Sequence, residues 1–215
     1  MSQGRESVSL RWPPEHVSEL RDFPTRALSP RQWLFRIVRI GNCPWWFGNS
    51  MAGRFDLPEP KGTCYLAADA LAALMEIVGP ESQSGTVSEE FLRGRRLVRL
   101  HVPQELFLSD STSRESSRFG MTGEIGTITP YDRPQAWAAR LHAAGSAGIV
   151  YWLRHDPSRM EGFALFGPQG ERSDWPWEDE APLGIPPRLI IGLQEAFGIE
   201  VVEAPRRDQL RIIAD

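Results

Sequence analysis

The sequence predicts a single α+β domain, built from short strands with a few amphipathic helices between them. The chain has 215 residues, of which 41% are hydrophobic, and this is enough to bury one full core. Runs of aromatic and β-branched residues stop at Gly or Pro, as strands do, while other segments repeat apolar residues at helical spacing. No internal repeat or sustained heptad pattern divides the chain further.

Composition and charge argue against several classes of protein. The formal net charge of −4 disfavours binding to nucleic acid phosphates, which needs a basic surface. No apolar run approaches the roughly 20 residues of a membrane span, and residues 1–20 do not resemble a secretion signal. Cys43 and Cys64 are too few for a disulfide framework and lack the spacing of a zinc site. We therefore expect a cytoplasmic protein with no metal, no membrane contact and no direct nucleic acid partner.

The first thirty residues contain four prolines, which leave room for one short helix near Glu15–Asp22. We interpret residues 1–30 as an N-terminal extension on the surface and residues 31–215 as the domain itself. The first two strands of that domain are expected at residues 33–40 and 63–67, which are rich in aromatic and β-branched side chains.

Two arginines interrupt the first of these strands. Arg36 and Arg39 lie three residues apart, so their side chains point to opposite faces of a sheet. One of them can lie at the surface, but burial of the other requires a carboxylate partner or an anionic ligand. A structural salt bridge and a phosphate site both remain open at this point.

A helix is expected from Asp69, its N-cap, to Val78, where Gly79-Pro80 ends it. Apolar residues recur on one side of this helix at Leu71, Leu74, Met75 and Val78. Glu76 lies about 140–150° from the centre of that stripe, beside alanines rather than long charged side chains. A solvated glutamate is the ordinary interpretation, but the small neighbours leave room for a ligand.

The rest of the chain predicts further elements around a long polar loop at 109–133. Loops of this length without structure are usually functional or mobile. The acidic, tryptophan-rich segment 173–180 is interpreted as a linker or flap rather than a regular element. The remaining expected elements are helices at 88–94, 134–144 and 186–197, and strands at 96–102, 148–153, 162–166, 199–204 and 210–214.

Common catalytic signatures are absent, including the Gly-x-Ser-x-Gly elbow, the phosphate-binding loop, the dinucleotide fingerprint and His-Glu-x-x-His. Four other motifs follow one another at close spacing: Phe35-Arg36-Ile37-Val38, Gly53-Arg54-Phe55, Tyr65-Leu66-Ala67 and then Glu76. This order resembles the RES domain family, and the likeness extends from Trp33 to Phe166. The resemblance implies a fold related to ADP-ribosyltransferases and an activity on NAD+, in proteins that are often toxins restrained by an antitoxin.

The resemblance also implies roles for individual residues. Arg36 and Arg54 would bind the pyrophosphate of NAD+, since a planar guanidinium with five donors suits phosphate oxygens. Tyr65 would stack on the nicotinamide ring or its ribose, with Phe55 completing the binding set. Glu76 would contact the ribose hydroxyls and stabilise the cation that forms as the glycosidic bond breaks. NAD+ is then the substrate, and no resident cofactor is expected.

One position departs from the family pattern, whose name records Arg, Glu and Ser. Leu153 takes the place of the serine after the strand at 148–151. Leucine donates no hydrogen bond, so either Ser158 or the loop at 109–117 supplies the hydroxyl, or activity is altered or lost.

We therefore predict an NAD+-consuming enzyme that cleaves the nicotinamide–ribose bond, as a glycohydrolase or phosphorylase, and acts as the toxin of a toxin–antitoxin system. Two alternatives stay open. One is a non-catalytic module of the same fold that binds a nucleotide or a protein, and the other is a mono-ADP-ribosyltransferase acting on a macromolecule. The expected partners are NAD+ and a cognate antitoxin protein, with a homodimer left open.

Overall fold

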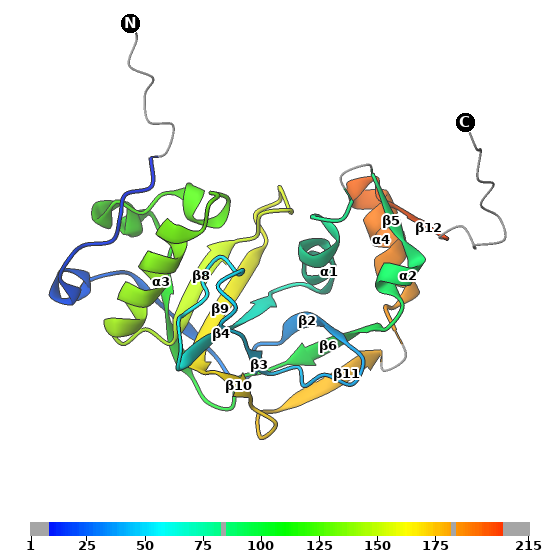
Figure 1. Ribbon diagram of the computed structural model, residues 1–215, viewed down its shortest axis with the longest axis horizontal. Coiled ribbons are helices and arrows are strands. Elements are labelled where there is room, and N and C mark those ends of the chain that lie inside the picture. Colours follow the sequence, from blue (N-terminus) through cyan, green and yellow to red (C-terminus); the bar gives the residue numbers. More distant parts are fainter. Residues whose placement is uncertain (1–8, 83–84, 182–183, 204–215) are drawn as a thin grey trace, which may run out of the picture.

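The computed structural model describes residues 9–82, 85–181 and 184–203, and an eight-stranded curled sheet forms its centre (Figure 1). The strand order is β1-β7-β8-β9-β4-β2-β6-β11, and all neighbours are antiparallel except β7 and β8. In chain order these strands are β1 (Thr25–Leu28), β2 (Leu34–Arg39), β4 (Lys61–Ala67), β6 (Arg95–Leu100), β7 (Leu106–Asp110), β8 (Gly148–Trp152), β9 (Glu161–Pro168) and β11 (Trp177–Ala181). Two small sheets pair β3 (Trp46–Phe47) with β10 (Gly170–Glu171), and β5 (Thr86–Ser88) with β12 (Glu200–Val202).

The helices pack on one face of the large sheet, in two groups. Helix α3 lies over β8, whereas α1 lies over β2 and β4 with α4 packed against it (Figure 1). The helices are α1 (Ala70–Val78), α2 (Glu89–Leu92), α3 (Asp132–Ala143) and α4 (Pro187–Phe197), with 3₁₀ helices at Val17–Leu20, Arg114–Phe119 and Gly123–Gly126. This mixture of a largely antiparallel sheet with few helices confirms the predicted α+β class. Across the described part of the chain, every helix is too short or too polar to traverse a bilayer.

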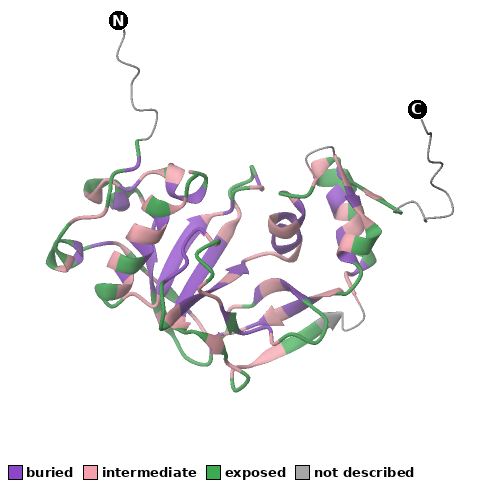
Figure 2. Cartoon of the chain, viewed as in Figure 1, coloured by how far each residue is buried: buried purple, intermediate pink, exposed green. Residues whose placement is uncertain are grey.

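The sheet separates two hydrophobic clusters, so the strands at its centre are buried on both faces (Figure 2). On β8, Ile149 and Tyr151 belong to the cluster under the helices, while Val150 belongs to the opposite one. The opposite cluster contains Trp45, and Trp175 packs against it with 4.9 Å between the two ring centroids. Alternation along each strand therefore decides which side chains can reach the helix side.

Several predicted elements are confirmed, within a residue or two at their ends. Strands β2 and β4 and helices α1 and α4 occupy the expected positions. Asp69 is the N-cap of α1, because its Oδ1 accepts hydrogen bonds from the main-chain N–H groups of Leu71 and Ala72 at 2.9 and 3.0 Å. The strand predicted at 210–214 lies outside the described residues.

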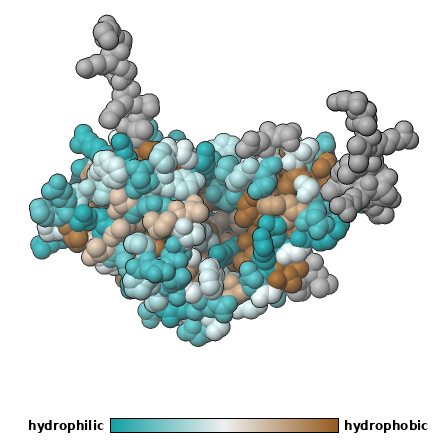
Figure 3. All heavy atoms as spheres, viewed as in Figure 1, coloured by the Kyte–Doolittle hydropathy of each residue, from teal (hydrophilic) through white to brown (hydrophobic). Residues whose placement is uncertain are grey.

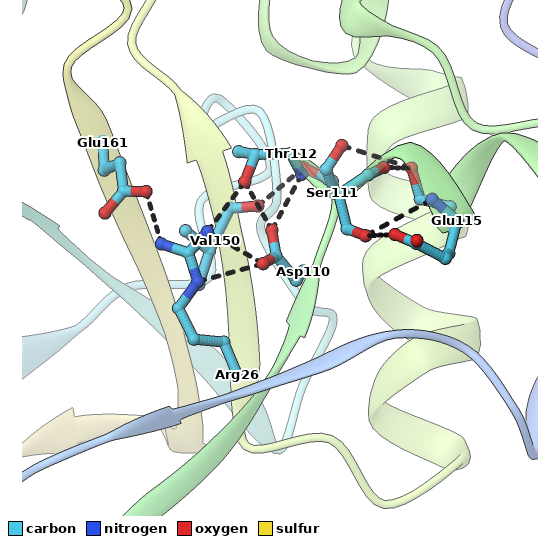
Figure 4. A network of polar contacts seen from close by, with 9 residues as sticks. Arg26, Asp110, Ser111, Thr112, Glu115, Val150 and Glu161 are labelled. Atoms are coloured by element: carbon cyan, nitrogen blue, oxygen red, sulfur yellow. Dashed lines mark hydrogen bonds and ion pairs between the residues drawn. The ribbon is translucent and has the colours of Figure 1, made fainter.

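The N-terminal stretch is more than a surface extension. Strand β1 forms one edge of the large sheet by pairing with β7, and Leu10, Leu20 and Phe23 are buried in the helix-side cluster. Figure 4 shows Arg26 of β1 joined to Asp110, Thr112 and Glu161, with the Nε donating to Asp110 at 2.9 Å. Prolines are unfavourable in helices and in central strands, but they are tolerated at an edge strand. The proline-rich composition therefore did not indicate β1.

Two segments expected to be irregular contain regular structure. The polar loop at 109–133 carries the second and third 3₁₀ helices, capped by Ser113 and Thr122. The acidic segment at 173–180 is not a free flap, because its second half forms the edge strand β11 against β6. Ion pairs explain this placement: Asp179 of β11 binds Arg96 of β6 at 2.6 Å, and Glu178 binds Arg99 at 2.5 Å.

Candidate functional site

A cavity of about 350 Å³ opens between helix α1, the sheet and the turn that joins β8 to β9. Figure 3 shows the surface hollowed at this place, between the two groups of helices. Its volume falls within the roughly 300–1,000 Å³ of typical ligand pockets. The polar and aromatic side chains that line it include Arg54, Tyr65, Glu76, Tyr131, Tyr151 and His155.

Three of the residues that line the cavity, Phe35, Ala67 and Tyr151, belong to one row that crosses four strands. Phe35 of β2 lies opposite Ala67 of β4, Ala67 lies opposite Gly162 of β9, and Gly162 lies opposite Tyr151 of β8. The two central residues are small and the two outer ones aromatic, so the middle of the row leaves space for neighbouring side chains. A Cβ at Gly162 would lie 2.6 Å from Cζ of Tyr151, so glycine lets that ring lie across β9.

Glu76 projects from α1 into this cavity. It lies off the apolar stripe of the helix, as predicted, and it is half-buried rather than surrounded by solvent. One oxygen, Oε1, accepts a hydrogen bond from the main-chain N–H of His155 at 3.1 Å. The second oxygen makes no hydrogen bond within the described residues, so it can accept one from a ligand.

Arg54 lies on the cavity wall and is only 9% exposed. Its Nη1 donates to the main-chain carbonyl of Ile128 at 2.6 Å, and its guanidinium lies 4.6 Å from the centre of the Tyr131 ring. Burial lowers the pKa of Arg54, although the group stays cationic at neutral pH. Among the residues that the structure describes, no carboxylate lies within ion-pair distance of Arg54. A buried cation with this environment favours an anionic ligand.

Tyr65 lines the cavity with its ring, while its hydroxyl has a structural role. The hydroxyl donates to Oδ1 of Asp56 and accepts from the main-chain N–H of Phe55, both at 2.8 Å. Burial and the neighbouring Asp56 charge raise the pKa of Tyr65 well above its ordinary value. These bonds fix the turn at 53–56, whose glycine is required because a Cβ at Gly53 would lie 2.3 Å from the Asp56 carboxylate.

Glu76, Arg54 and Tyr65 lie within residues 7–182, which match the family model of the RES domain. The chain belongs to the RES family. Among solved structures, a similar fold occurs in the crystal structure of the M. tuberculosis MbcT-MbcA toxin–antitoxin complex. The TM-score is 0.59 at 17% identity, over 77% of this chain and 92% of that one, so this likeness concerns the fold. No curated protein matches the sequence.

The other two residues predicted for the RES site are placed differently. The guanidinium of Arg36 donates to the main-chain carbonyl of Pro44 at 2.5 Å and to Sγ of Cys64 at 3.1 Å. By alternation it shares the side of β2 that carries Leu34 and Val38, away from the helices. Arg36 contributes to the cavity wall, but its charged group is engaged elsewhere, while Arg39 is exposed.

Phe55 is fully buried in the helix-side cluster and does not line the cavity. Its ring packs against Tyr151 with 4.7 Å between the centroids, so its contribution is to support that side chain.

With leucine at the family serine position, none of the described residues that line this cavity carries an aliphatic hydroxyl. Leu153 is buried and lines the wall. Ser158, considered as a substitute, donates instead to Oδ1 of Asp156 at 2.5 Å and does not line the cavity. Four serines of the 109–117 loop, Ser111, Ser113, Ser116 and Ser117, line a neighbouring hollow that shares Leu153 and Arg154 with the cavity.

Tyr151 is a cavity residue that the residue patterns did not single out, as are Tyr131 and Arg154. The strand at 148–152 has the pattern of a buried apolar strand. The only hint to Tyr151 in that strand was alternation, which places it on the same face as Ile149. Within the described residues, no group of three His, Cys, Asp or Glu side chains could hold a metal ion. The RES cavity thus offers one carboxylate, one buried guanidinium and aromatic rings.

Proposed function

We propose that this RES protein consumes NAD+ by cleaving the bond between nicotinamide and ribose. The observation that carries the proposal is the convergence of Glu76 and Arg54 on one cavity lined by aromatic rings. The two charges complement the substrate, which has a cationic nicotinamide end and an anionic pyrophosphate.

Glu76 would supply the catalytic charge. As the bond from C1′ of ribose to the nicotinamide nitrogen breaks, its electron pair goes to nicotinamide and the positive charge passes to the ribose. A carboxylate fixed beside the ribose stabilises this cation. Nicotinamide leaves as a neutral molecule, so no acid is needed to protonate it. Water or phosphate then attacks C1′, with loss of a proton, to give a hydrolysed or phosphorylated product.

Arg54 would bind the pyrophosphate, with the rings of Tyr65 and Tyr131 along the same wall. Because Arg54 is buried and lacks a carboxylate partner among the described residues, its charge is not screened by bulk water. The bound orientation would bring the ribose toward Glu76. Holding a substrate in its reactive geometry is itself a large part of catalysis.

The test is release of nicotinamide from NAD+ by the purified protein. Glu76→Gln should slow release by roughly 100-fold or more, since it removes the charge but keeps the shape. The matched control is Glu81→Gln, an exposed glutamate just after α1, which should leave the rate unchanged. Equal rates for the parent and Glu76→Gln would refute the catalytic assignment.

A second candidate is a RES-fold module that binds NAD+ without turning it over, and Leu153 at the serine position favours it. Calorimetric binding of NAD+ without release of nicotinamide would support this alternative. Transfer of label from NAD+ onto a macromolecule would instead indicate an ADP-ribosyltransferase.

We further propose that the protein is the toxin of a cytoplasmic toxin–antitoxin pair. Support comes from membership of the RES family and from the fold shared with the M. tuberculosis complex. Expression of the chain in bacteria should arrest growth and deplete NAD+, and Glu76→Gln should do neither. Growth arrest by both proteins alike would contradict a toxicity that depends on NAD+.

A further inference from the structure

Tyr151 presents an unused hydrogen-bond donor to the cavity. The side chain is only 5% exposed, and its hydroxyl makes no hydrogen bond to any other described residue. The hydroxyl is nonetheless not sealed from the cavity, since Tyr151 forms part of the lining. A hydroxyl that faces a ligand cavity and has no protein partner is available to donate to a bound ligand.

The surroundings hold the Tyr151 ring in one place. Phe55 packs against it at 4.7 Å between centroids, and Gly162 opens the space beneath it. The ring reaches from β8 across β9, toward the cavity wall formed by α1. Tyr151 is therefore a packed side chain of the cavity lining rather than an exposed surface tyrosine.

The phenol also keeps its proton. Burial raises the pKa of Tyr151 well above its ordinary value, and the charge of Glu76 raises it further, while Arg54 opposes this. Tyr151 lines the same cavity as Glu76 and Arg54, the two groups assigned to the substrate. Glu76 as a carboxylate can only accept hydrogen bonds, whereas Tyr151 in its neutral form can donate one.

A ribose hydroxyl can both donate and accept hydrogen bonds, so an acceptor and a donor on the protein can bind the same ribose. We infer that Tyr151 is a further catalytic residue, whose hydroxyl donates a hydrogen bond to the nicotinamide-side ribose while Glu76 accepts one from it. This inference rests on the proposed function. It also explains how the site supplies a hydroxyl although Leu153 stands where the family has serine.

The test compares nicotinamide release by the parent protein and by Tyr151→Phe. Phenylalanine keeps the ring and its packing on Phe55, so thermal unfolding should be unchanged while kcat/KM falls roughly 10- to 100-fold. Leu153→Ser in the Tyr151→Phe background should restore part of the rate, because residue 153 lines the same wall. A Tyr151→Phe variant within twofold of the parent would overturn the inference. The inference would also be overturned if Tyr151→Phe released nicotinamide slowly but unfolded at a lower temperature than the parent, and if Leu153→Ser did not restore its rate.

The proposed function can fail separately. If the parent protein releases no nicotinamide, NAD+ cleavage is wrong, and calorimetry with NAD+ then decides the role of Tyr151. Binding weakened at least fivefold by Tyr151→Phe would support the hydrogen bond, and equal affinity of the two proteins would reject it.

Discussion

The main-chain N–H of His155 donates to Oε1 of Glu76 at 3.1 Å, and this bond ties the β8–β9 turn to helix α1. The His155 ring lies against the last turn of the same helix, next to Gly79. Glu76 is therefore oriented from both sides, by its own helix and by a turn that lies 79 residues further along the chain. Such support is what a carboxylate needs if it is to act at a fixed position.

Gly79→Ala should disturb this arrangement. A Cβ at residue 79 would lie 2.5 Å from Cγ of His155, so the ring and its N–H must move away from Glu76. We expect nicotinamide release to fall, and stability to fall by about 1–3 kcal/mol because of overpacking. Gly123→Ala is the matched control, since a Cβ there meets nothing within 4 Å. Parent-like activity of Gly79→Ala would show that the turn does not position Glu76.

Arg36 should matter for stability rather than for binding NAD+. Its guanidinium satisfies the buried carbonyl of Pro44, so Arg36→Gln should lower the free energy of unfolding by about 1–3 kcal/mol. The folded variant should keep the KM of the parent for NAD+. Arg39→Gln, at the exposed end of the same strand, should change stability by less than about 0.5 kcal/mol. A KM raised tenfold by Arg36→Gln would return this residue to the substrate site.

Local sequence patterns predicted the position of a candidate site residue where that position depends on a single helix or turn. The period of α1 and its Asp69 cap were sufficient to place Glu76 off the core stripe. Arg36 shows the limit of such reasoning: both faces of β2 are buried, so alternation separates Arg36 from Arg39 but does not say which face carries the cavity. The position of Tyr151 at the cavity depends on the pairing of β8 with β9 and of β9 with β4, which no local pattern reports.

The acidic edge strand illustrates the same limit. Trp177, Glu178 and Asp179 have no apolar alternation of their own. They form a strand where β6 offers Arg99 opposite Glu178 and Arg96 within reach of Asp179. Non-local charge pairing of this kind is invisible from either segment alone.

Asp179→Asn should therefore weaken the edge of the sheet. Both Asp179 oxygens accept from Nη1 of Arg96, at 2.6 and 2.7 Å, and the Arg96 side chain is only 11% exposed. We expect a loss of about 1–2 kcal/mol in the free energy of unfolding, measured by urea denaturation. Glu178→Gln removes a more exposed pair with Arg99 and should cost less than about 1 kcal/mol. Equal losses for the two variants would mean that burial does not strengthen the Arg96 pair.

His155 should make stability depend on pH just below neutrality. Burial lowers the pKa of His155, and Arg154 and Arg54 lower it further, although Glu76 opposes them. The unfolded chain then binds a proton more readily than the folded one, so stability falls as pH drops below the ordinary histidine pKa of about 6.5. His155→Asn cannot titrate and should lose less stability between pH 7 and pH 5.5 than the parent. Urea midpoints at both pH values measure this, and parallel losses in parent and variant would assign the pH dependence to other groups.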